Sequence, residues 1–248
     1  MISFSSDDVF LVTGASSGFG AASAVLLNTL GATVIASGRD EGRLLAVREN
    51  CDAPGRCVCE AKDLAEDIES LPGWVASLKA KHGKLRGLLY SAGVCDVLPV
   101  RSQNYSGMKA LFDANVFAAY QVARGFLDKR NNIGKGASLV FISSLAAVRA
   151  SKGTSSYAAS KGAIVSLVLA LAAEYASAGI RVNAVSPAAV DTPMTRTVCP
   201  DFENELSGFP LGPGSPQDIA EAAAFLLSSS AGWMTGQNLV LDGGYGLR

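Results

Sequence analysis

Tyr157 and Lys161 are the two side chains in this sequence whose types and spacing most directly suggest chemistry. If their segment is helical, residues four apart lie on one face, so both side chains can point into one cleft. A free phenol has a pKa of about 10 and transfers protons poorly at neutral pH. We expect the neighbouring ammonium to lower that pKa, which would make Tyr157 a general acid or base.

Ser144 is a third candidate, because it lies just past the apolar run 139–142, which has the pattern of a buried strand. In parallel α/β sheets, ligands bind at the carboxyl ends of the strands, so Ser144 is expected at the same site. The alternative is that Tyr157 only packs and Lys161 is solvated, as in many helices. The other motifs of the chain favour the catalytic interpretation.

Three glycines follow the first apolar run, 9–12, at positions Gly14, Gly18 and Gly20. Glycine permits backbone conformations that other residues avoid, and it lets a diphosphate approach the main chain. The helix expected at 21–30 would add free N–H groups and the positive end of its dipole. A tight turn that needs glycine for packing alone is the alternative, but a turn between strand and helix favours a nucleotide site.

The residues after the second predicted strand, 33–37, indicate which dinucleotide binds. An acid at this point accepts hydrogen bonds from the adenosine ribose, whereas an arginine holds a 2′-phosphate. Gly38 leaves room and Arg39 can pair with phosphate, so the sequence favours NADP over NAD. Asp40 leaves two alternatives, because it is either a displaced ribose-binding acid or the N-cap of a helix around Arg43.

Strands and helices alternate along the whole chain, which predicts a parallel sheet covered on both faces. We therefore expect an α/β, Rossmann-like, doubly wound parallel sheet of about seven strands in a single domain, 1–248. A proline-rich loop at about 188–216 is expected to cover the substrate. The predicted strands are 9–12, 33–37, 56–60, 85–90, 137–142, 180–185 and 239–241. The predicted helices are 21–30, 43–49, 71–82, 105–129, 157–177 and 217–228.

Composition excludes several classes of protein. The chain has 248 residues, 49% of them apolar, which argues against disorder. Its formal net charge of −1 gives no basic surplus for binding nucleic acid. No signal segment opens the sequence, and the longest apolar stretch, 163–173, is well below the ~20 residues that span a bilayer. We therefore expect a soluble, cytoplasmic protein with no membrane partner.

The five cysteines and the single histidine, His82, leave little material for a metal site, so none is expected. An odd number of cysteines fits reduced thiols in a cytoplasm. A Ser-His-Asp hydrolase would need His82 as its base, but His82 lies at a charged helix end, where a solvated side chain is expected.

Together these motifs resemble the short-chain dehydrogenase/reductase family, and the resemblance runs from Thr13 to Gly244. The resemblance implies that Asn115, Ser144, Tyr157 and Lys161 are catalytic. The cofactor-binding residues expected from the motifs and the resemblance are Gly14, Ser16, Ser17, Gly18, Phe19, Gly20, Gly38, Arg39, Asp63, Leu64, Ala92, Gly93, Tyr157, Lys161, Pro187, Val190 and Thr192. Thr235-Gly236-Gln237 and Asp242-Gly243-Gly244 are similar to the family's C-terminal end.

The same resemblance implies a mechanism for a small carbonyl or alcohol substrate. Tyr157 would give a proton to the carbonyl oxygen as hydride arrives from the nicotinamide of NADP. Lys161 would lower the pKa of Tyr157 and hold the nicotinamide ribose, and Ser144 would stabilise charge on the oxygen. Asn115 would support a water chain to Lys161. Asp63 would approach the adenine ring, and the segment 187–192 would hold the nicotinamide carboxamide.

Two positions depart from the family pattern. Tyr90-Ser91 replaces two asparagines that brace the sheet in the family, and Ala188 replaces a glycine. We expect altered packing at these positions without loss of activity, and Ser91 is expected to keep one hydrogen bond, to Thr13.

The expected substrate walls, Val94, Cys95, Leu145, Ala146 and the loop 194–211, are mostly apolar. Within the enzyme class, the alternative to a general ketone reductase is a 3-oxoacyl-carrier-protein reductase. Outside that class, the alternative is a non-enzymatic nucleotide sensor on the same fold.

Helix 157–177 is apolar almost all round, so both of its sides should be buried. One side would meet the sheet. The other side, with helix 105–129, would meet a second subunit, as in family members that pair these helices across a two-fold axis. We expect a homodimer or a homotetramer.

Overall fold

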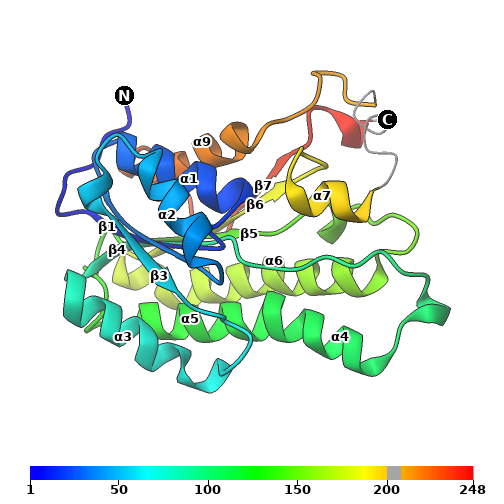
Figure 1. Cartoon of the computed structure of the whole chain (residues 1–248), viewed down its shortest axis with the longest axis horizontal. Helices are drawn as coiled ribbons and strands as arrows, with labels where there is room; N and C mark the ends of the chain where they lie inside the picture. The colour runs from blue at the N-terminus through cyan, green and yellow to red at the C-terminus, as the bar shows by residue number, and fades with distance from the viewer. Residues whose placement is uncertain (200–207, 248) are drawn as a thin grey trace.

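A parallel sheet runs through the centre of the molecule (Figure 1). The computed structural model describes residues 1–199 and 208–247, in which seven strands pair in the order β3-β2-β1-β4-β5-β6-β7. The strands are β1 Val9–Thr13, β2 Thr33–Gly38, β3 Cys57–Ala61, β4 Leu85–Tyr90, β5 Ser138–Ile142, β6 Arg181–Pro187 and β7 Asn238–Leu241. Every pairing is parallel, so the predicted α/β sheet is confirmed.

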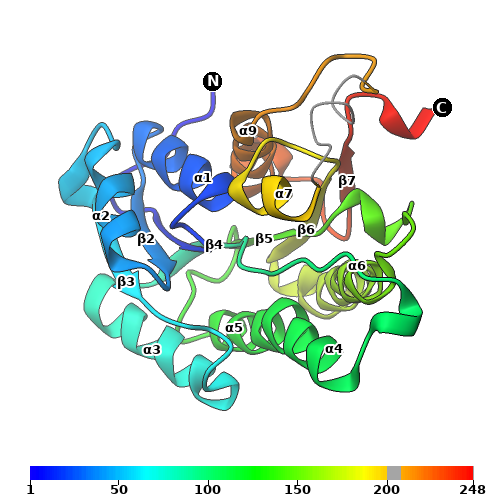
Figure 2. The same cartoon turned by 45° about the vertical axis from the view of Figure 1, so that its right-hand side comes forward.

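Helices cover both faces of the sheet, as Figure 2 shows. One face packs against α1 Gly18–Thr29, α2 Glu41–Glu49 and α9 Pro216–Leu227. The opposite face packs against α3 Leu71–His82, α5 Ala118–Leu127 and α6 Ser155–Tyr175. Two shorter helices, α4 Tyr105–Phe112 and α7 Pro193–Val198, lie beyond the carboxyl ends of the strands.

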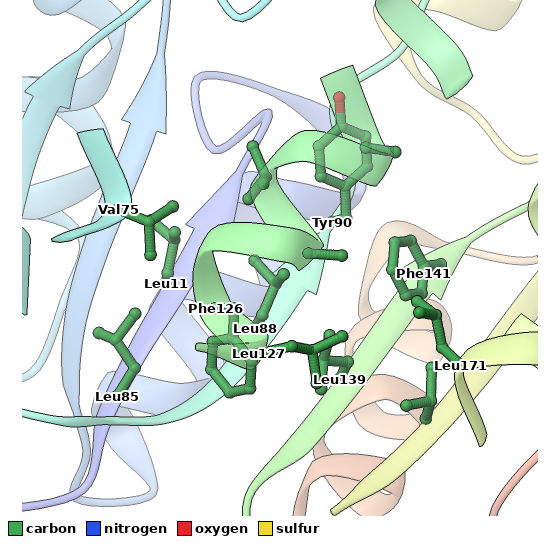
Figure 3. Close-up of a cluster of buried hydrophobic side chains, with 14 of the residues drawn as sticks. Leu11, Val75, Leu85, Leu88, Tyr90, Phe126, Leu127, Leu139, Phe141 and Leu171 are labelled. Carbon is green, nitrogen blue, oxygen red and sulfur yellow. The ribbon is translucent and has the colours of Figure 1, made fainter. Parts of the chain in front are cut away.

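The central strands are buried on both sides because they are apolar runs without alternation, the pattern that parallel sheets require. All five residues of β1 and of β5 are buried. Figure 3 shows how Leu11, Leu88 and Leu139 from neighbouring strands meet Phe126 of α5 and Leu171 of α6 in one cluster. The core therefore fixes the strands rigidly and leaves their carboxyl ends to build a site.

The strand order reverses between β1 and β4, which is where ligands bind in open α/β sheets. The side-chain oxygen of Thr13 accepts hydrogen bonds from the backbone N–H of Ser91 at 3.1 Å and of Ala92 at 3.3 Å. The bond expected between Ser91 and Thr13 is thus present, through the backbone of Ser91. The loops after β1 and β4 are joined at this point.

Element boundaries differ from the sequence prediction at several places. Helix α1 begins at Gly18, not at 21, so two of the three glycines lie inside its first turn. The predicted helix 105–129 is interrupted by a π-turn, Asp113–Phe117, and ends at Leu127. The predicted loop 188–216 contains α7, and its residues 200–207 lie outside the described residues.

The interruption of the long helix has a tertiary cause. The side chain of Asn115, inside the π-turn, is hydrogen-bonded to Val94 and to Ser160, and the Ala114 carbonyl accepts a bond from Tyr90. These bonds come from three different parts of the chain, so the helical periodicity of segment 105–129 cannot predict them. A π-turn of this kind inserts one residue into a helix and frequently marks a functional site.

Gly125 on α5 gives a test of the helix packing. A Cβ added there would lie 2.8 Å from Cα of Pro72 and 2.9 Å from Cβ of Val75, both on α3. We predict that Gly125→Ala lowers the free energy of unfolding by about 1–3 kcal/mol through overpacking, outweighing a helix-propensity gain of about 1 kcal/mol. Urea titration of the purified protein measures this.

The matched control is Gly73→Ala on α3. No described atom lies within 4 Å of a Cβ at that position, so this variant should be neutral or slightly more stable. Equal stability changes in the two variants would contradict the close α3–α5 approach.

Candidate active site

A pocket of about 260 Å³ opens at the carboxyl ends of β1, β2 and β4, at the reversal of strand order. It brings together segments that are far apart in the sequence: the glycine turn, the end of β2, the end of β3, the turn after β4 and the start of α6. Its walls are formed by Gly14, Ser16, Ser17, Gly18, Phe19, Ser37, Gly38, Arg39, Lys62, Asp63, Leu64, Ala65, Ser91, Ala92, Gly93, Val94, Ala114, Ile142, Ser143, Tyr157, Lys161, Thr192, Pro193 and Met194.

The glycines of the first turn do different work. Gly14 has a φ of +66°, and a Cβ there would lie 2.8 Å from the backbone N of Ala92, so any side chain would separate the two loops. Gly20 packs against the carbonyl oxygen of Gly14 and does not line the pocket, so it serves packing. Gly18 has a φ of +54° and begins α1, whose first N–H groups have no side-chain cap from Ser17. A helix start of this kind is suited to a phosphate group.

Asp40 is the N-cap of α2, and this resolves the two alternatives for it. Its Oδ1 accepts a hydrogen bond from the backbone N of Arg43 at 3.0 Å, and its Oδ2 pairs with the guanidinium of Arg43 at 3.3 Å. Asp40 is also absent from the pocket walls. The N-cap interpretation is confirmed, and the acid is not displayed toward the site.

Two cations line the pocket beside the end of β2. Arg39 follows Gly38 directly, and the backbone N of Lys62 donates to the carbonyl oxygen of Gly38 at 2.9 Å. Across residues 1–199 and 208–247, no carboxylate forms an ion pair with either cation. Asp63, which also lines the pocket, accepts a hydrogen bond from the backbone N of Ala65 at 2.9 Å. Positive charge that has no ion-pair partner among the described residues therefore gathers at this end of the pocket.

The hydroxyl of Ser144 lies close enough to Tyr157 to lower the pKa of the phenol. Tyr157 lies in the first turn of α6, and Ser144 precedes the short turn Leu145–Ala147, where its Oγ accepts from the backbone N of Ala146 at 3.2 Å. The short turn therefore positions one hydroxyl and the helix positions the other. A carbonyl oxygen placed between them can receive a hydrogen bond from each.

Lys161 is buried, with 6% of its surface exposed, and its amine is fixed to the backbone. Nζ donates to the carbonyl oxygen of Ile142 at 3.0 Å and lies 5.7 Å from the centroid of the Tyr157 ring. The hydroxyl of Ser143 donates to the carbonyl oxygen of Lys161 at 2.9 Å, which ties this part of α6 to the end of β5. As predicted, Tyr157 and Lys161 lie on one helix, and both point into the same pocket.

The prediction that the pKa of Tyr157 is lowered is wrong, because the surroundings of the phenol in the structure raise it. Burial raises the pKa of Tyr157, the nearby thiol of Cys95 raises it further, and the hydroxyl of Ser144 opposes both. Burial also lowers the pKa of Lys161 to about 8, with Cys95 acting in the opposite direction. Because the amine bonds to Ile142 and is itself costly to charge, it does not compensate the burial of the phenol.

Asn115 braces the site from beneath the pocket wall. Its Oδ1 accepts from the backbone N of Val94 at 2.8 Å, and its Nδ2 donates to the Val94 carbonyl at 2.9 Å and to Oγ of Ser160 at 3.0 Å. A Cβ added at Gly93 would lie 2.9 Å from Oδ1 of Asn115 and 3.5 Å from Nζ of Lys161. Gly93 therefore lets the asparagine and the lysine approach the same loop.

Most sequence-predicted cofactor residues line the pocket, and a few do not. Gly20, Pro187 and Val190 are outside its walls, and so are two of the predicted catalytic residues, Asn115 and Ser144. Pro187 ends β6, and the buried Val190 bridges to Gly214, so both support the segment that leads to Thr192. Thr192 is the N-cap of α7, and its side chain lines the pocket next to Gly18.

Lys62 is the pocket residue that the sequence analysis missed and that matters most chemically. The signal was present, because Lys62 precedes Asp63 at the end of a predicted strand, where ligands bind. Met194 and Pro193 at the start of α7 were expected only as part of the substrate loop, yet both line the pocket.

This geometry defines a class of protein: a nucleotide-binding oxidoreductase on a doubly wound sheet, with Tyr157 and Lys161 on the pocket walls and Ser144 beside Tyr157. A family model described as enoyl-(acyl carrier protein) reductase matches residues 14–246. The chain belongs to the short-chain dehydrogenase/reductase family.

Relatives of known activity differ in what they act on. The chain is 32% identical over 240 residues to cis-4-hydroxycyclohexanecarboxylate dehydrogenase of Sinomonas cyclohexanicum, which covers 96% of each protein. It is 34% identical over 244 residues to the 3-oxoacyl-acyl-carrier-protein reductase of Thermotoga maritima, covering 95% of this chain and 96% of that one. A dehydrogenase/reductase from Sinorhizobium meliloti 1021 superposes with a TM-score of 0.91 at 30% identity, covering 98% of this chain and 96% of that chain.

Proposed function

We propose that this protein is an NADP-dependent oxidoreductase that interconverts a ketone and a secondary alcohol by hydride transfer, with Tyr157 as general acid and base. The observation that carries the proposal is that Tyr157 and Lys161 line the same crevice as Gly14 and Gly18. A proton donor and a phosphate-binding turn in one pocket suit hydride transfer to a carbonyl carbon. We infer that residues 1–248 contribute both functions as one domain.

The residues of the chain divide the work of the reaction. A bound nicotinamide supplies or accepts the hydride. At neutral pH Tyr157 is protonated, because the phenol pKa is about 10 even when free and burial raises it further. The protonated form is the one that can give a proton to the carbonyl oxygen. Ser144, beside Tyr157, donates to the same oxygen as negative charge develops there. Lys161, with a pKa of about 8, can return a proton toward Tyr157 near neutral pH.

The preference for NADP rests on charge at the end of β2. Arg39 and Lys62 both line the pocket with no carboxylate partner among the described residues, while Asp40 is engaged at the start of α2. A 2′-phosphate would gain charge-assisted hydrogen bonds from such cations. An unphosphorylated ribose would find no free acid at the same position.

A second candidate activity is the reduction of a 3-oxoacyl group on an acyl carrier protein. It is favoured by the similarity to the Thermotoga maritima enzyme of that name. A non-enzymatic nucleotide sensor is the third possibility, and the retention of Tyr157 and Lys161 on the pocket walls, with Ser144 beside Tyr157, argues against it.

We predict that the purified protein oxidises NADPH with members of a panel of ketones and 3-oxoacyl thioesters. Tyr157→Phe should lower kcat by at least about 100-fold, because the proton donor is lost, while NADPH binding measured by fluorescence stays within about twofold of wild type. Tyr120→Phe, an exposed tyrosine on α5, is the matched control and should keep full activity. A wild-type protein inactive on the whole panel, or an unaffected Tyr157→Phe, would contradict the proposed function.

For the cofactor, Arg39→Ala should lower kcat/KM for NADPH by about 10- to 100-fold and leave kcat/KM for NADH nearly unchanged. Arg43→Ala is the control, because Arg43 is exposed, pairs with Asp40 and does not line the pocket. Steady-state kinetics with both dinucleotides gives the comparison. Equal losses for the two cofactors, or a wild-type preference for NADH, would refute the assignment to NADP.

We also propose a soluble homodimer or homotetramer, assembled through the surface of α4, α5 and α6. Large apolar side chains are exposed there: Met108 40%, Phe117 50%, Tyr120 51% and Leu169 55%. The segment Ser155–Ala178 is long and apolar enough to cross a membrane, but it carries Tyr157 and Lys161 at the pocket and packs against the sheet. A second subunit is therefore the better cover for it.

Light scattering at micromolar concentration should give the mass of two or four chains of 25.5 kDa. A mass of one chain across that range would refute the assembly.

A further inference from the structure

Tyr90 is a buried phenol at the end of β4, and its hydroxyl reaches the π-turn that carries Asn115. The residue is 2% exposed, and its ring packs 6.1 Å from that of Phe141. Oη donates a hydrogen bond to the carbonyl oxygen of Ala114 at 3.1 Å. Figure 3 shows the hydroxyl pointing out of the apolar cluster toward the neighbouring helix. The ring alone would satisfy the packing, so the hydroxyl needs a separate explanation.

The partner of that hydroxyl lies where the helix is least regular. The π-turn, Asp113–Phe117, inserts one residue between α4 and α5 and contains both Ala114 and Asn115. Such a turn is less stable than continuous α-helix, so contacts from outside must hold it. The bond from Tyr90 is one of these contacts, and it comes from the strand that ends at the pocket.

Asn115 connects the π-turn to the catalytic residues by hydrogen bonds. Its amide bonds to both backbone groups of Val94, which lines the pocket, and to the hydroxyl of Ser160 on α6. The Ser160 hydroxyl in turn donates to the carbonyl oxygen of Tyr157 at 2.8 Å. A continuous series of hydrogen bonds therefore runs from Tyr90 through the π-turn to the backbone of the proposed proton donor.

We propose that Tyr90 is a positioning residue for carbonyl reduction: its hydroxyl holds the π-turn at Ala114, so that Asn115 keeps Val94 and the start of α6 in their working arrangement. The proposal rests on the proposed function, because it assigns Tyr90 a part in that reaction. It differs from the expectation that the residue replacing a family asparagine here alters packing without loss of activity. Tyr90 itself does not line the pocket and acts through the π-turn, in which Ala114 lines the pocket and Asn115 bonds to Val94 and Ser160.

The test begins with Tyr90→Phe, which removes the hydroxyl and keeps the ring in the core. With NADPH and the best substrate of the panel, kcat should fall about tenfold, since one directional hydrogen bond is lost. The Kd for NADPH should stay within about twofold, because the glycine turn, Arg39 and Lys62 have no contact with the removed hydroxyl. Tyr175→Phe, a partly buried tyrosine at the far end of α6, is the matched control and should keep wild-type kcat.

A double-mutant cycle with Asn115→Ala separates positioning from general weakening of the core. If Tyr90 acts through Asn115, the double variant should lose no more kcat than Asn115→Ala alone. Thermal melting of all variants is recorded in parallel.

Three results would overturn the role of Tyr90: an unchanged kcat in Tyr90→Phe, losses that multiply in the double variant, or a lower melting temperature with kcat intact. Each presupposes an active wild type. A wild type that turns over nothing refutes the proposed function itself, and with it this role.

Discussion

The contact between the loop after β1 and the loop after β4 is the constraint on which the site depends. At that point the backbone of Gly14 approaches the backbone of Ala92 so closely that no side chain fits at position 14. The side-chain oxygen of Thr13 joins the two loops, because it accepts hydrogen bonds from the backbone N–H groups of Ser91 and Ala92. The glycine turn, the pocket floor and the segment leading to Asn115 all start from this junction. A parallel sheet whose strand order reverses here supplies the crevice, and the junction sets its width.

Much of the architecture could be predicted because it is written in local patterns. Helix 71–82 and strand 85–90 have the predicted ends, since Gly83 stops the helix and the apolar residues Leu88 to Tyr90 lead the strand into the turn that follows it. The π-turn could not be predicted, because it depends on bonds from Tyr90, Val94 and Ser160, residues distant in sequence. The sequence period of α4 and α5 is helical throughout, and only tertiary partners reveal the insertion.

The site was predictable in its membership and less so in its electrostatics. Spacing identified Tyr157, Lys161 and Ser144, and the structure brings the first two to the pocket and the third to the phenol. The sign of the shift in the pKa of Tyr157 was wrong, because burial is a property of the folded chain and a sequence motif does not reveal it. The raised pKa keeps the phenol in the protonated form that reduction consumes, and it also makes Tyr157 a weaker acid than a phenol whose pKa lies near neutral pH.

The N-cap at the start of α2 has a consequence for how this chain could change its cofactor. Asp40 is the only acid in the segment that follows β2 before the helix begins, and its carboxylate already stabilises the first turn of that helix through the backbone of Arg43. Recruiting it to bind a ribose would leave the helix uncapped, at a cost of about 1 kcal/mol in stability. An ancestor or a designer seeking the unphosphorylated dinucleotide would therefore gain more from a new carboxylate at position 38 or 39 than from turning the existing one.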